Sequence, residues 1–239
     1  MASKYLAREE APIGPETWKA LDAAMMEAAK GVLTGRRLLH IEGPYGLGLK
    51  AVPLQDAEME AGLIASPVIP LSLIQTTFAL GKRDLAAHER DGVSLDTTVV
   101  AQAAIECARL EDTLVFKGAS GVPGLLTVEG SNALQLSSWD EVGKAAEDII
   151  KAVTVLDGAG FHGPYCLALA PGRYNLLFRR YPRGPMTELE HLKMMVADGV
   201  FKAPILESGG VLLASGRQFA SFKSGYYICF YFTYHKTFF

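Results

Sequence analysis

The sequence predicts an α+β fold, and three observations support this. Amphipathic helical patterns are mixed with short apolar strands, without the regular strand–helix–strand order that a doubly wound sheet requires. Residues 61–81 carry no charge over 21 positions, and Pro67 and Pro70 favour extended chain over helix there. With 239 residues, the chain can bury a substantial core as one large domain or two small ones.

The N-terminal half begins with a predicted helix over residues 15–32, because proline suits the first helical position. Its apolar side chains share one face, at spacings of three and four, and are Trp18, Leu21, Met25, Ala28 and Val32. A short strand is expected at residues 38–41, followed by a sharp Gly-Pro-Tyr-Gly bend at residues 43–46. The uncharged run that follows predicts an arm that buries itself against another subunit.

The C-terminal half alternates helices with short strands. Ser94 can cap a helix over residues 95–116, with an apolar stripe of Val99, Val100, Ala103, Cys107, Leu110 and Leu114. A capping box of Ser138 and Glu141 predicts a helix that ends near residues 158–160. After it we expect a buried strand at 165–170, a short helix at 174–179, a loop at 181–185, a helix from the Thr187–Glu190 capping box to 198, and a strand at 211–214.

Charge and cysteine content exclude several classes of protein. The net charge of −3 gives no electrostatic case for nucleic acid as the main partner. Three distant cysteines, Cys107, Cys166 and Cys229, form no disulfide framework, so a reducing cytoplasm is the simplest location. Glu9 and Glu10 stand where a signal peptide needs an apolar core. The prolines and polar residues of the uncharged run argue against a membrane span.

No pattern in the sequence supports catalysis or metal binding. The glycines at residues 46–48 are not followed by the helix that a dinucleotide site requires. Glu106, Glu111 and Asp112 lack the Glu-x-x-His pairs of a di-iron bundle, so they are interpreted as surface charges or local hydrogen-bonding groups. The five histidines share no ligand spacing with one another or with the cysteines. No serine lies in a Gly-x-Ser-x-Gly elbow, and we predict a protein that is not an enzyme.

Six segments, in order along the chain, together resemble one family. They are GRRLLHIEGPYG (35–46), IPLSLIQTTFAL (69–80), HERDG (88–92), LEDTLVFKG (110–118), GVPGLL (121–126) and GPYCLALAP (163–171). They resemble the encapsulins, the linocin-like shell proteins of prokaryotic nanocompartments, and HERDG resembles the turn before that family's long helix. The resemblance implies the tailed-phage major-capsid fold. On that plan the peripheral domain takes residues 1–48 and 82–130 with the tail 221–239, the extended loop takes 49–81, and the axial domain takes 131–220.

The resemblance also implies a function and its sites. The chain would be a shell subunit that self-assembles into an icosahedral nanocompartment around a cargo enzyme, a ferritin-like protein or a dye-decolourising peroxidase, in iron storage or oxidative stress. The cargo's terminal peptide would lie in a groove of Met25, Ala29, Val32, Leu33, Arg36, Arg37 and Leu39. A pore loop would consist of Tyr181, Pro182, Arg183, Gly184 and Pro185. The intersubunit arm would present Val52, Leu54, Val68, Ile69, Leu71, Leu73, Phe78 and Leu80.

Alternatives remain open for each of these assignments. The groove residues could serve only to pack their own subunit, and the loop could be an ordinary surface loop. A virus or prophage capsid protein that packages nucleic acid shares the implied fold, although the acidic balance weighs against it. A soluble hydrolase or dehydrogenase would instead be a monomer or small oligomer with a deep polar cleft.

The chain departs from the family pattern in two places. Some encapsulins stack a flavin on a tryptophan after the arm, but Arg83 stands at that position, so flavin binding is not expected. Past Gly216 and Arg217, family members continue with a Gly-Gln-Asp run, whereas this chain ends in SFKSGYYICFYFTYHKTFF. That alternating aromatic tail is compatible with a strand, and a frameshift or an altered terminus would explain it.

Overall fold

The computed structural model describes residues 6–119 and 121–224. The predictions for residues 225–239, including Cys229 and the aromatic tail, therefore lie outside the described residues. The chain divides into two compact units. The first comprises Met1–Val32, Gly43–Leu110 and Ser224–Phe239, and the second comprises Leu33–Glu42 and Glu111–Lys223. The predicted peripheral domain, extended loop and axial domain have other boundaries and remain a prediction.

Helix α1 (Pro15–Val32) of the first unit begins and ends where the sequence predicts. Thr17, Leu21, Met25 and Ala29 form its buried face, at the four-residue spacing of an amphipathic helix. A short 3-10 helix, Arg8–Glu10, precedes it. Arg8 is held there by an ion pair with Asp22 at 2.7 Å and by stacking over the Trp18 ring.

Helix α3 (Lys82–Asp91) was not predicted, and it contains most of the segment interpreted as a turn. The helix ends at Asp91, and the φ of 68° at Gly92 turns the chain so that Val93 N donates to the carbonyl of Ala87 at 3.4 Å. None of the residues of α3 is buried. Glu89 ties it to α1 by accepting hydrogen bonds from Gly14 N at 2.6 Å and Thr17 Oγ1 at 2.9 Å.

Helix α4 (Thr98–Lys117) starts three residues later than predicted and belongs to both units. Asp96, and not Ser94, caps the first turn of α4, because the Asp96 carboxylate accepts a hydrogen bond from Thr98 N at 2.9 Å. The predicted stripe is correct at Val100 and Ala103. It is wrong at Val99 and Leu110, which are 39% and 45% exposed.

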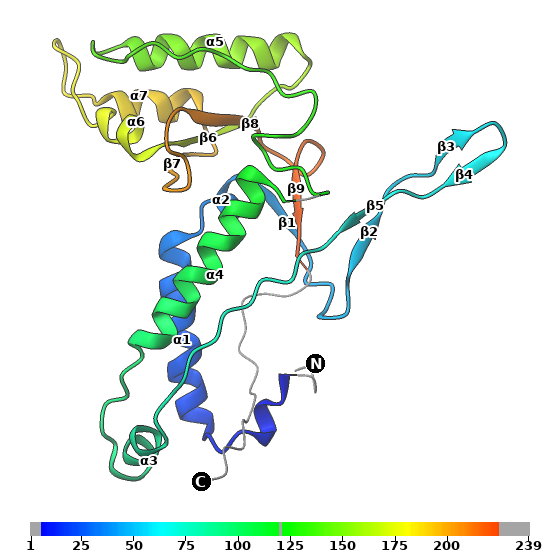
Figure 1. The fold of residues 1–239 in the computed structure, drawn as a ribbon. Coiled ribbons are helices and arrows are strands. Elements are labelled where there is room, and N and C mark those ends of the chain that lie inside the picture. Colours follow the sequence, from blue (N-terminus) through cyan, green and yellow to red (C-terminus); the bar gives the residue numbers. More distant parts are fainter. Residues whose placement is uncertain (1–5, 120, 225–239) are drawn as a thin grey trace. The chain divides into compact units, whose positions relative to one another are not determined.

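The second unit is built around the three-stranded sheet β7–β6–β8 (Figure 1). Its central strand, β6 (Tyr165–Leu169), is buried throughout, as predicted. β8 (Gly210–Ala214) pairs with it antiparallel, and β7 (Val200–Lys202), which was not predicted, pairs with it parallel. Side chains alternate along β6, so successive residues enter different cores.

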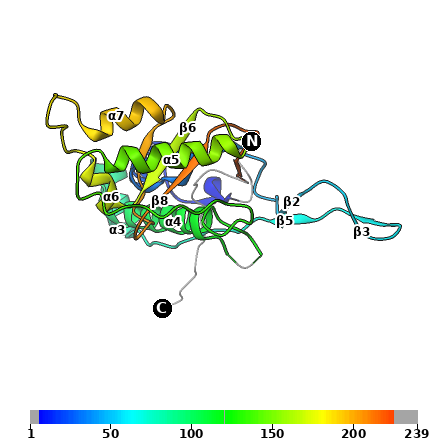
Figure 2. The same ribbon diagram turned by 90° about the horizontal axis from the view of Figure 1, so that it is seen from above.

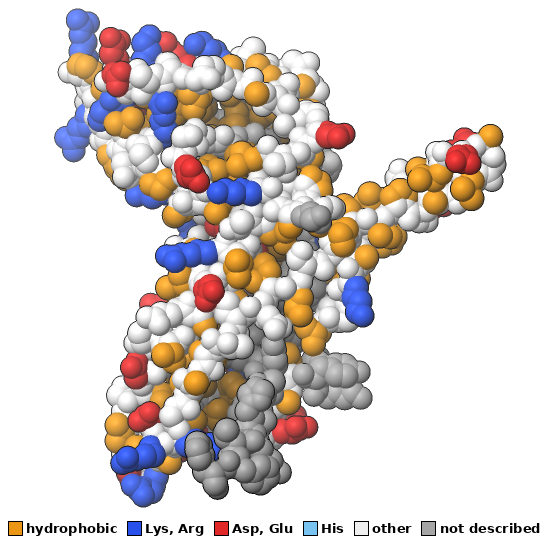
Figure 3. Space-filling view, in the orientation of Figure 1, with side chains coloured by type: hydrophobic (Ala, Val, Ile, Leu, Met, Phe, Trp, Pro, Cys, Tyr) orange, Lys and Arg blue, Asp and Glu red, His pale blue; other side chains and the backbone are white. Residues whose placement is uncertain are grey.

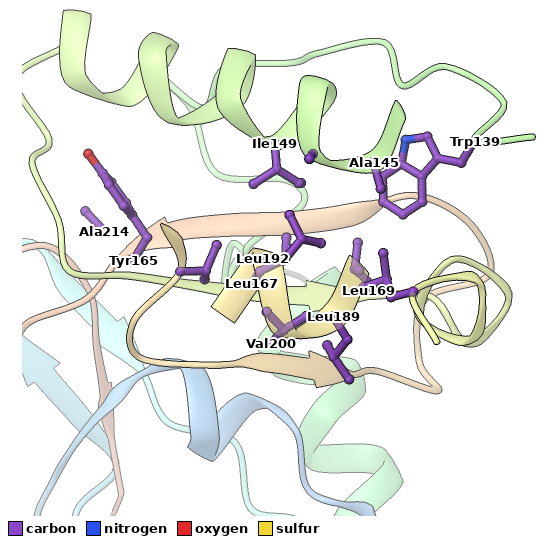
Figure 4. Close-up of a cluster of buried hydrophobic side chains, with 13 residues drawn as sticks. Trp139, Ala145, Ile149, Tyr165, Leu167, Leu169, Leu189, Leu192, Val200 and Ala214 are labelled. Carbon is purple, nitrogen blue, oxygen red and sulfur yellow. The ribbon is translucent and has the colours of Figure 1, made fainter. Parts of the chain in front are cut away.

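One face of this sheet supports the main hydrophobic core (Figure 4). Tyr165, Leu167 and Leu169 pack there against α5 (Lys144–Gly158) and α7 (Glu188–Met195), and Figure 2 shows α5 crossing the sheet. The other face carries Cys166 and Ala168. It packs against a second cluster that includes Leu38 of α2 (Gly35–Leu38) and Phe116 of α4.

Three predictions for this unit need correction. α5 begins at Lys144 and not at the expected Ser138 capping box, because residue 139 is a fully buried tryptophan with a φ of 61°. α6 (Pro171–Leu176) begins three residues before the predicted short helix, with proline in its first turn. The strand predicted at 38–41 is displaced, since α2 occupies residues up to Leu38 and β1 is His40–Glu42.

The capping box of α7 is confirmed. Thr187 Oγ1 accepts from Glu190 N at 3.2 Å, and Thr187 N donates to the Glu190 carboxylate at 2.7 Å. The helix ends at Met195, earlier than predicted. β1 pairs in parallel with β9 (Ser221–Lys223), and Glu42 accepts from both Lys223 Nζ at 2.6 Å and Arg217 Nε at 3.3 Å.

Candidate functional site

Residues 51–70 of the first unit form a two-stranded hairpin (Figure 1, cyan). β2 (Ala51–Pro53) pairs antiparallel with β5 (Val68–Pro70). Further along, β3 (Ala57–Glu60) pairs with β4 (Leu63–Ala65) around a turn at Gly62, whose φ is 81°. This part of the predicted extended loop folds back on itself as a hairpin, and its role as an intersubunit arm remains a prediction.

The hairpin exposes an unusual amount of apolar surface. Every residue from 53 to 70 is exposed, and hydrophobic side chains, coloured orange in Figure 3, lie along the hairpin. The large apolar residues that contribute, with their exposed fractions, are Leu54 47%, Met59 63%, Leu63 56%, Ile64 67%, Val68 56% and Ile69 38%. An isolated two-stranded hairpin is marginally stable in water, and contiguous exposed apolar patches mark interaction sites. This hairpin is the candidate functional site.

The second half of the predicted arm behaves differently. Thr76 Oγ1 donates to the carbonyl of Ala103 on α4 at 3.1 Å and lies 3.2 Å from Cys107 Sγ. Phe78 and Leu80 are half-buried within their own subunit, as is Leu71, whereas Leu73 is 74% exposed. Of the predicted arm residues, Leu54, Val68, Ile69 and Leu73 are therefore exposed, and Val52 is half-buried.

Glu111 and Asp112 of α4, which were interpreted as surface or locally bonded groups, are buried and form hydrogen bonds with the first residues of α2. Asp112 accepts hydrogen bonds from Thr34 N at 2.9 Å and from Gly35 N at 2.9 Å. Glu111 receives Arg36 in a two-pronged ion pair, at 2.6 Å from Nε and 2.8 Å from Nη2. Burial raises the pKa of Asp112, and the hydrogen bonds from the two amides oppose that rise. Glu106 is exposed, as the surface interpretation expects. Glu111 and Asp112 are buried and bond residues 75 and 78 positions away, so for these two the interpretation as surface or locally bonded groups is wrong.

The predicted peptide-groove residues are distributed over both units. Met25, Ala29 and Val32 belong to the first unit, where Met25 and Ala29 are buried. The remaining four belong to the second unit: Leu33 is buried, Arg36 is paired with Glu111, Arg37 is exposed and Leu39 is half-buried. The groove assignment remains a prediction.

The predicted pore loop is an exposed turn with a firmly held base. Arg180 and Thr187 pair across it, and Tyr181 N donates to Met186 O at 3.1 Å. The Tyr181 hydroxyl lies 2.7 Å from His191 Nδ1 on α7, and burial, followed by the charge of Glu188, raises the pKa of Tyr181. Pro182, Arg183, Gly184 and Pro185 are exposed. A loop is confirmed here, while its role at a pore remains a prediction.

Metal binding and membrane insertion find no support within residues 6–119 and 121–224. No group of three or more His, Cys, Asp or Glu side chains in these ranges is arranged to hold a metal ion. None of the helices described there combines the length and apolarity needed to cross a bilayer. Arg83, at the position where a flavin would stack in some encapsulins, is exposed on α3. The absence of flavin remains a prediction.

Comparison with known proteins identifies the family. A sequence model of the linocin family, described as "Encapsulating protein for peroxidase", matches residues 3–237. The type 1 encapsulin shell protein of Myxococcus xanthus is 31% identical over 232 residues, which cover 90% of this chain and 81% of the relative. The chain belongs to the encapsulin family. A diheme-cytochrome–encapsulin shell fusion protein of Kuenenia stuttgartiensis is 32% identical, and the match covers 87% of this encapsulin and 62% of the longer fusion.

A solved structure confirms the fold. The virus-like particle from Pyrococcus furiosus superposes with a TM-score of 0.65, over 84% of this encapsulin and 80% of that chain. The two sequences are 20% identical, so this likeness concerns the fold alone. The predicted α+β fold of the capsid type is confirmed.

Sequence reasoning missed part of the hairpin surface. Met59, Leu63 and Ile64 are among its most exposed apolar residues, yet the segment around Met59 is charged and has no clear strand or helix period. Gly62 is the signal that could have revealed the turn, because it separates two short segments able to pair as strands.

Proposed function

We propose that this encapsulin is a structural shell subunit that self-assembles into a closed icosahedral compartment around a cargo enzyme. The exposed apolar hairpin of residues 51–70 carries the proposal. Buried apolar surface contributes about 25 cal/mol per Å², so a hairpin that is exposed in the free subunit gains stability when a neighbour covers it. Repeated contacts of one kind around symmetry axes close into a container.

A peroxidase is the cargo that the family description supports. The fusion relative from Kuenenia stuttgartiensis is named for a diheme cytochrome joined to its shell domain. A ferritin-like cargo with a role in iron storage is the other candidate from the family resemblance. In either case the shell residues would bind and enclose the cargo and perform no chemistry themselves.

Size-exclusion chromatography of the purified full chain, followed by negative-stain electron microscopy, tests this proposal. A megadalton peak that contains closed, uniform shells is the expected result. A monomer or small oligomer at the same concentration would contradict the proposal and favour a soluble enzyme.

The ratio of absorbance at 260 and 280 nm of the same peak separates the two capsid-type functions. We expect a protein-like ratio, because a chain with a net charge of −3 has little electrostatic attraction for the phosphates of nucleic acid. A nucleic-acid-like ratio that persists after nuclease treatment would favour the viral alternative.

A further inference from the structure

The far end of the hairpin carries a β-bulge. Glu58 is opposed to Ile64 and Glu60 is opposed to Leu63, so β3 has one more residue than β4 between these two pairs. The extra residue is Met59, which has no directly opposed partner on β4. A bulge bends its strand and redirects the side chain at that position, and bulges are concentrated at sheet edges and next to functional sites. The bulge thus marks Met59 as a candidate for a role beyond strand pairing.

Met59 is also one of the two most exposed methionines among residues 6–119 and 121–224. Its exposed fraction is 63%, close to the 67% of Met194 on α7, whereas Met25 on α1 is 4% exposed. A thioether that is open to solvent is also open to small oxidants, which convert this flexible apolar side chain into a polar sulfoxide. Exposure therefore predicts that Met59 and Met194 react readily and that Met25 does not.

The two exposed methionines differ in where they lie. Met194 is in the last turn of α7, outside the candidate functional site. Met59 is within that site, between the positions that pair with Leu63 and Ile64, which are 56% and 67% exposed. A sulfoxide is polar, and a polar group that loses water without gaining a hydrogen bond opposes an apolar contact. Oxidation of Met59 therefore changes the apolar surface of the hairpin, and oxidation of Met194 leaves it as it is.

We propose that Met59 is a peroxide-sensitive modification site, and that its oxidation in the free subunit blocks assembly of the shell. The consequence for assembly rests on the proposed function, in which a neighbour covers the hairpin. The oxidant is a hydroperoxide, the class of compound that the proposed peroxidase cargo consumes.

The reaction needs no other partner. The sulfur lone pair of Met59 attacks the terminal oxygen of the hydroperoxide, and an S–O bond forms as the O–O bond breaks. The transferred oxygen passes its proton to the departing oxygen, which leaves as water or an alcohol. Sulfur is oxidised by two electrons and the hydroperoxide is reduced by two, so the product is methionine sulfoxide.

Three variants of the full chain test the proposal. Met59→Leu keeps the apolar surface and removes the sulfur, and Met194→Leu is the matched control at an equally exposed methionine. Particles are dissociated, treated with hydrogen peroxide, freed of it and returned to assembly conditions. We expect the wild type and Met194→Leu to lose about tenfold or more of the particle peak in size-exclusion chromatography, and Met59→Leu to keep it. Met59→Gln introduces a polar uncharged group, and it should show the same loss without peroxide.

Peptide mass spectrometry of the treated subunits measures oxidation at each methionine. The peroxide dose is kept below that at which buried Met25 reacts, so that the subunit stays folded, and Met59 should be oxidised about tenfold faster than Met25. The proposal is overturned if Met59 stays unmodified at that dose, if Met59→Leu loses as much of the particle peak as the wild type, or if Met59→Gln assembles normally. Failure of the untreated wild-type chain to form particles would instead refute the proposed function, so the two failures are distinguishable.

Discussion

At the scale of single residues, buried carboxylates hold loops of the second unit in place. Asp148 on α5 accepts hydrogen bonds from Ser137 N at 2.7 Å, Ser137 Oγ at 2.8 Å and Trp139 Nε1 at 2.9 Å. Glu188, which is fully buried, accepts from Gly143 N at 2.8 Å and pairs with Arg179 at 2.9 Å. These contacts replace the helical turn that the sequence predicts at residues 138–141.

Stability should depend on pH through Asp148. Burial alone would raise its pKa, but the hydrogen bonds from Ser137, Trp139 and Lys151 outweigh burial and lower it from 3.8 to about 2. Because the folded pKa is depressed, the carboxylate stabilises the fold above about pH 4 and loses this effect as the pH falls towards 2. The shift corresponds to ~2.5 kcal/mol at neutral pH.

Denaturant unfolding of Asp148→Asn against wild type measures this contribution. The difference in unfolding free energy should be ~2.5 kcal/mol at pH 7 and should shrink by pH 3. Glu147→Gln, at an exposed neighbour on the same helix, is the control and should unfold like the wild type at both values. An equal deficit for Asp148→Asn at pH 7 and pH 3 would contradict the assignment.

Two glycines four residues apart should respond oppositely to alanine. A Cβ on Gly35 would lie 2.8 Å from Val115 Cγ1, so Gly35→Ala must displace a buried side chain, at a cost of about 1–3 kcal/mol. Gly31 is on α1, and among the described residues no atom outside its chain neighbours and its own helix backbone lies within 4 Å of the position that an alanine methyl would take there. Gly31→Ala should therefore stabilise the helix by about 0.5–1 kcal/mol. Thermal unfolding of both variants checks this, and equal melting temperatures would argue against it.

At the scale of elements, α3 depends on a polar anchor and has no buried face. Glu89 accepts from the backbone of Gly14 and the hydroxyl of Thr17, at the start of α1, and the hydrogen bond from Gly14 is the main cause of its lowered pKa. A helix of ten residues is too short to be stable alone. The link between α3 and α1 therefore supports both helices.

Glu89→Gln should lower the melting temperature at neutral pH, since it removes the charge that favours a helix N-terminus. The effect should diminish below about pH 4, because the pKa of Glu89 is depressed in the fold and protonation removes the same charge. Glu27→Gln, an exposed position within α1, serves as the comparison. A melting temperature for Glu89→Gln equal to that of Glu27→Gln would rule out the anchor.

The elements that were predicted correctly have local signals, and those missed do not. The side chains of Thr187 and Glu190 each accept a hydrogen bond from the other residue's backbone N–H within one turn, so the start of α7 follows from the sequence. Ser138 and Glu141 carry the same pattern, but burial of Trp139 and the distant carboxylate of Asp148 override it. α3 has no buried stripe to reveal it. β7 is three residues long and is fixed by its pairing with β6, more than 30 residues earlier.

At the scale of the whole molecule, every residue from 53 to 70 is exposed, so we expect changes in this segment to affect assembly of the shell and to leave folding of the subunit unchanged. Because Val52 and Ile69 are directly opposed and turn their backbone N–H and C=O groups toward each other, a two-residue Asn-Gly turn can join them in place of residues 53–68. The shortened chain should keep its secondary structure, since none of the deleted side chains is buried, but should lose the particle.

Analytical ultracentrifugation and circular dichroism of that deletion variant test the separation. A matched insertion of two residues in the exposed loop at residues 182–185 controls for loop changes in general. Intact particles from the deletion variant would show that the hairpin is dispensable for the shell.

The parallel pairing of β1 with β9 has a consequence for synthesis on the ribosome. Strand β1 cannot find its partner until residues 221–223 have been translated. The apolar hairpin of residues 51–70 is synthesised roughly 150 residues earlier. At about 5–20 residues per second, it is therefore complete roughly 8–30 s before β1 can pair with β9. During that interval the exposed apolar side chains of the hairpin remain uncovered, which makes the nascent chain prone to aggregation.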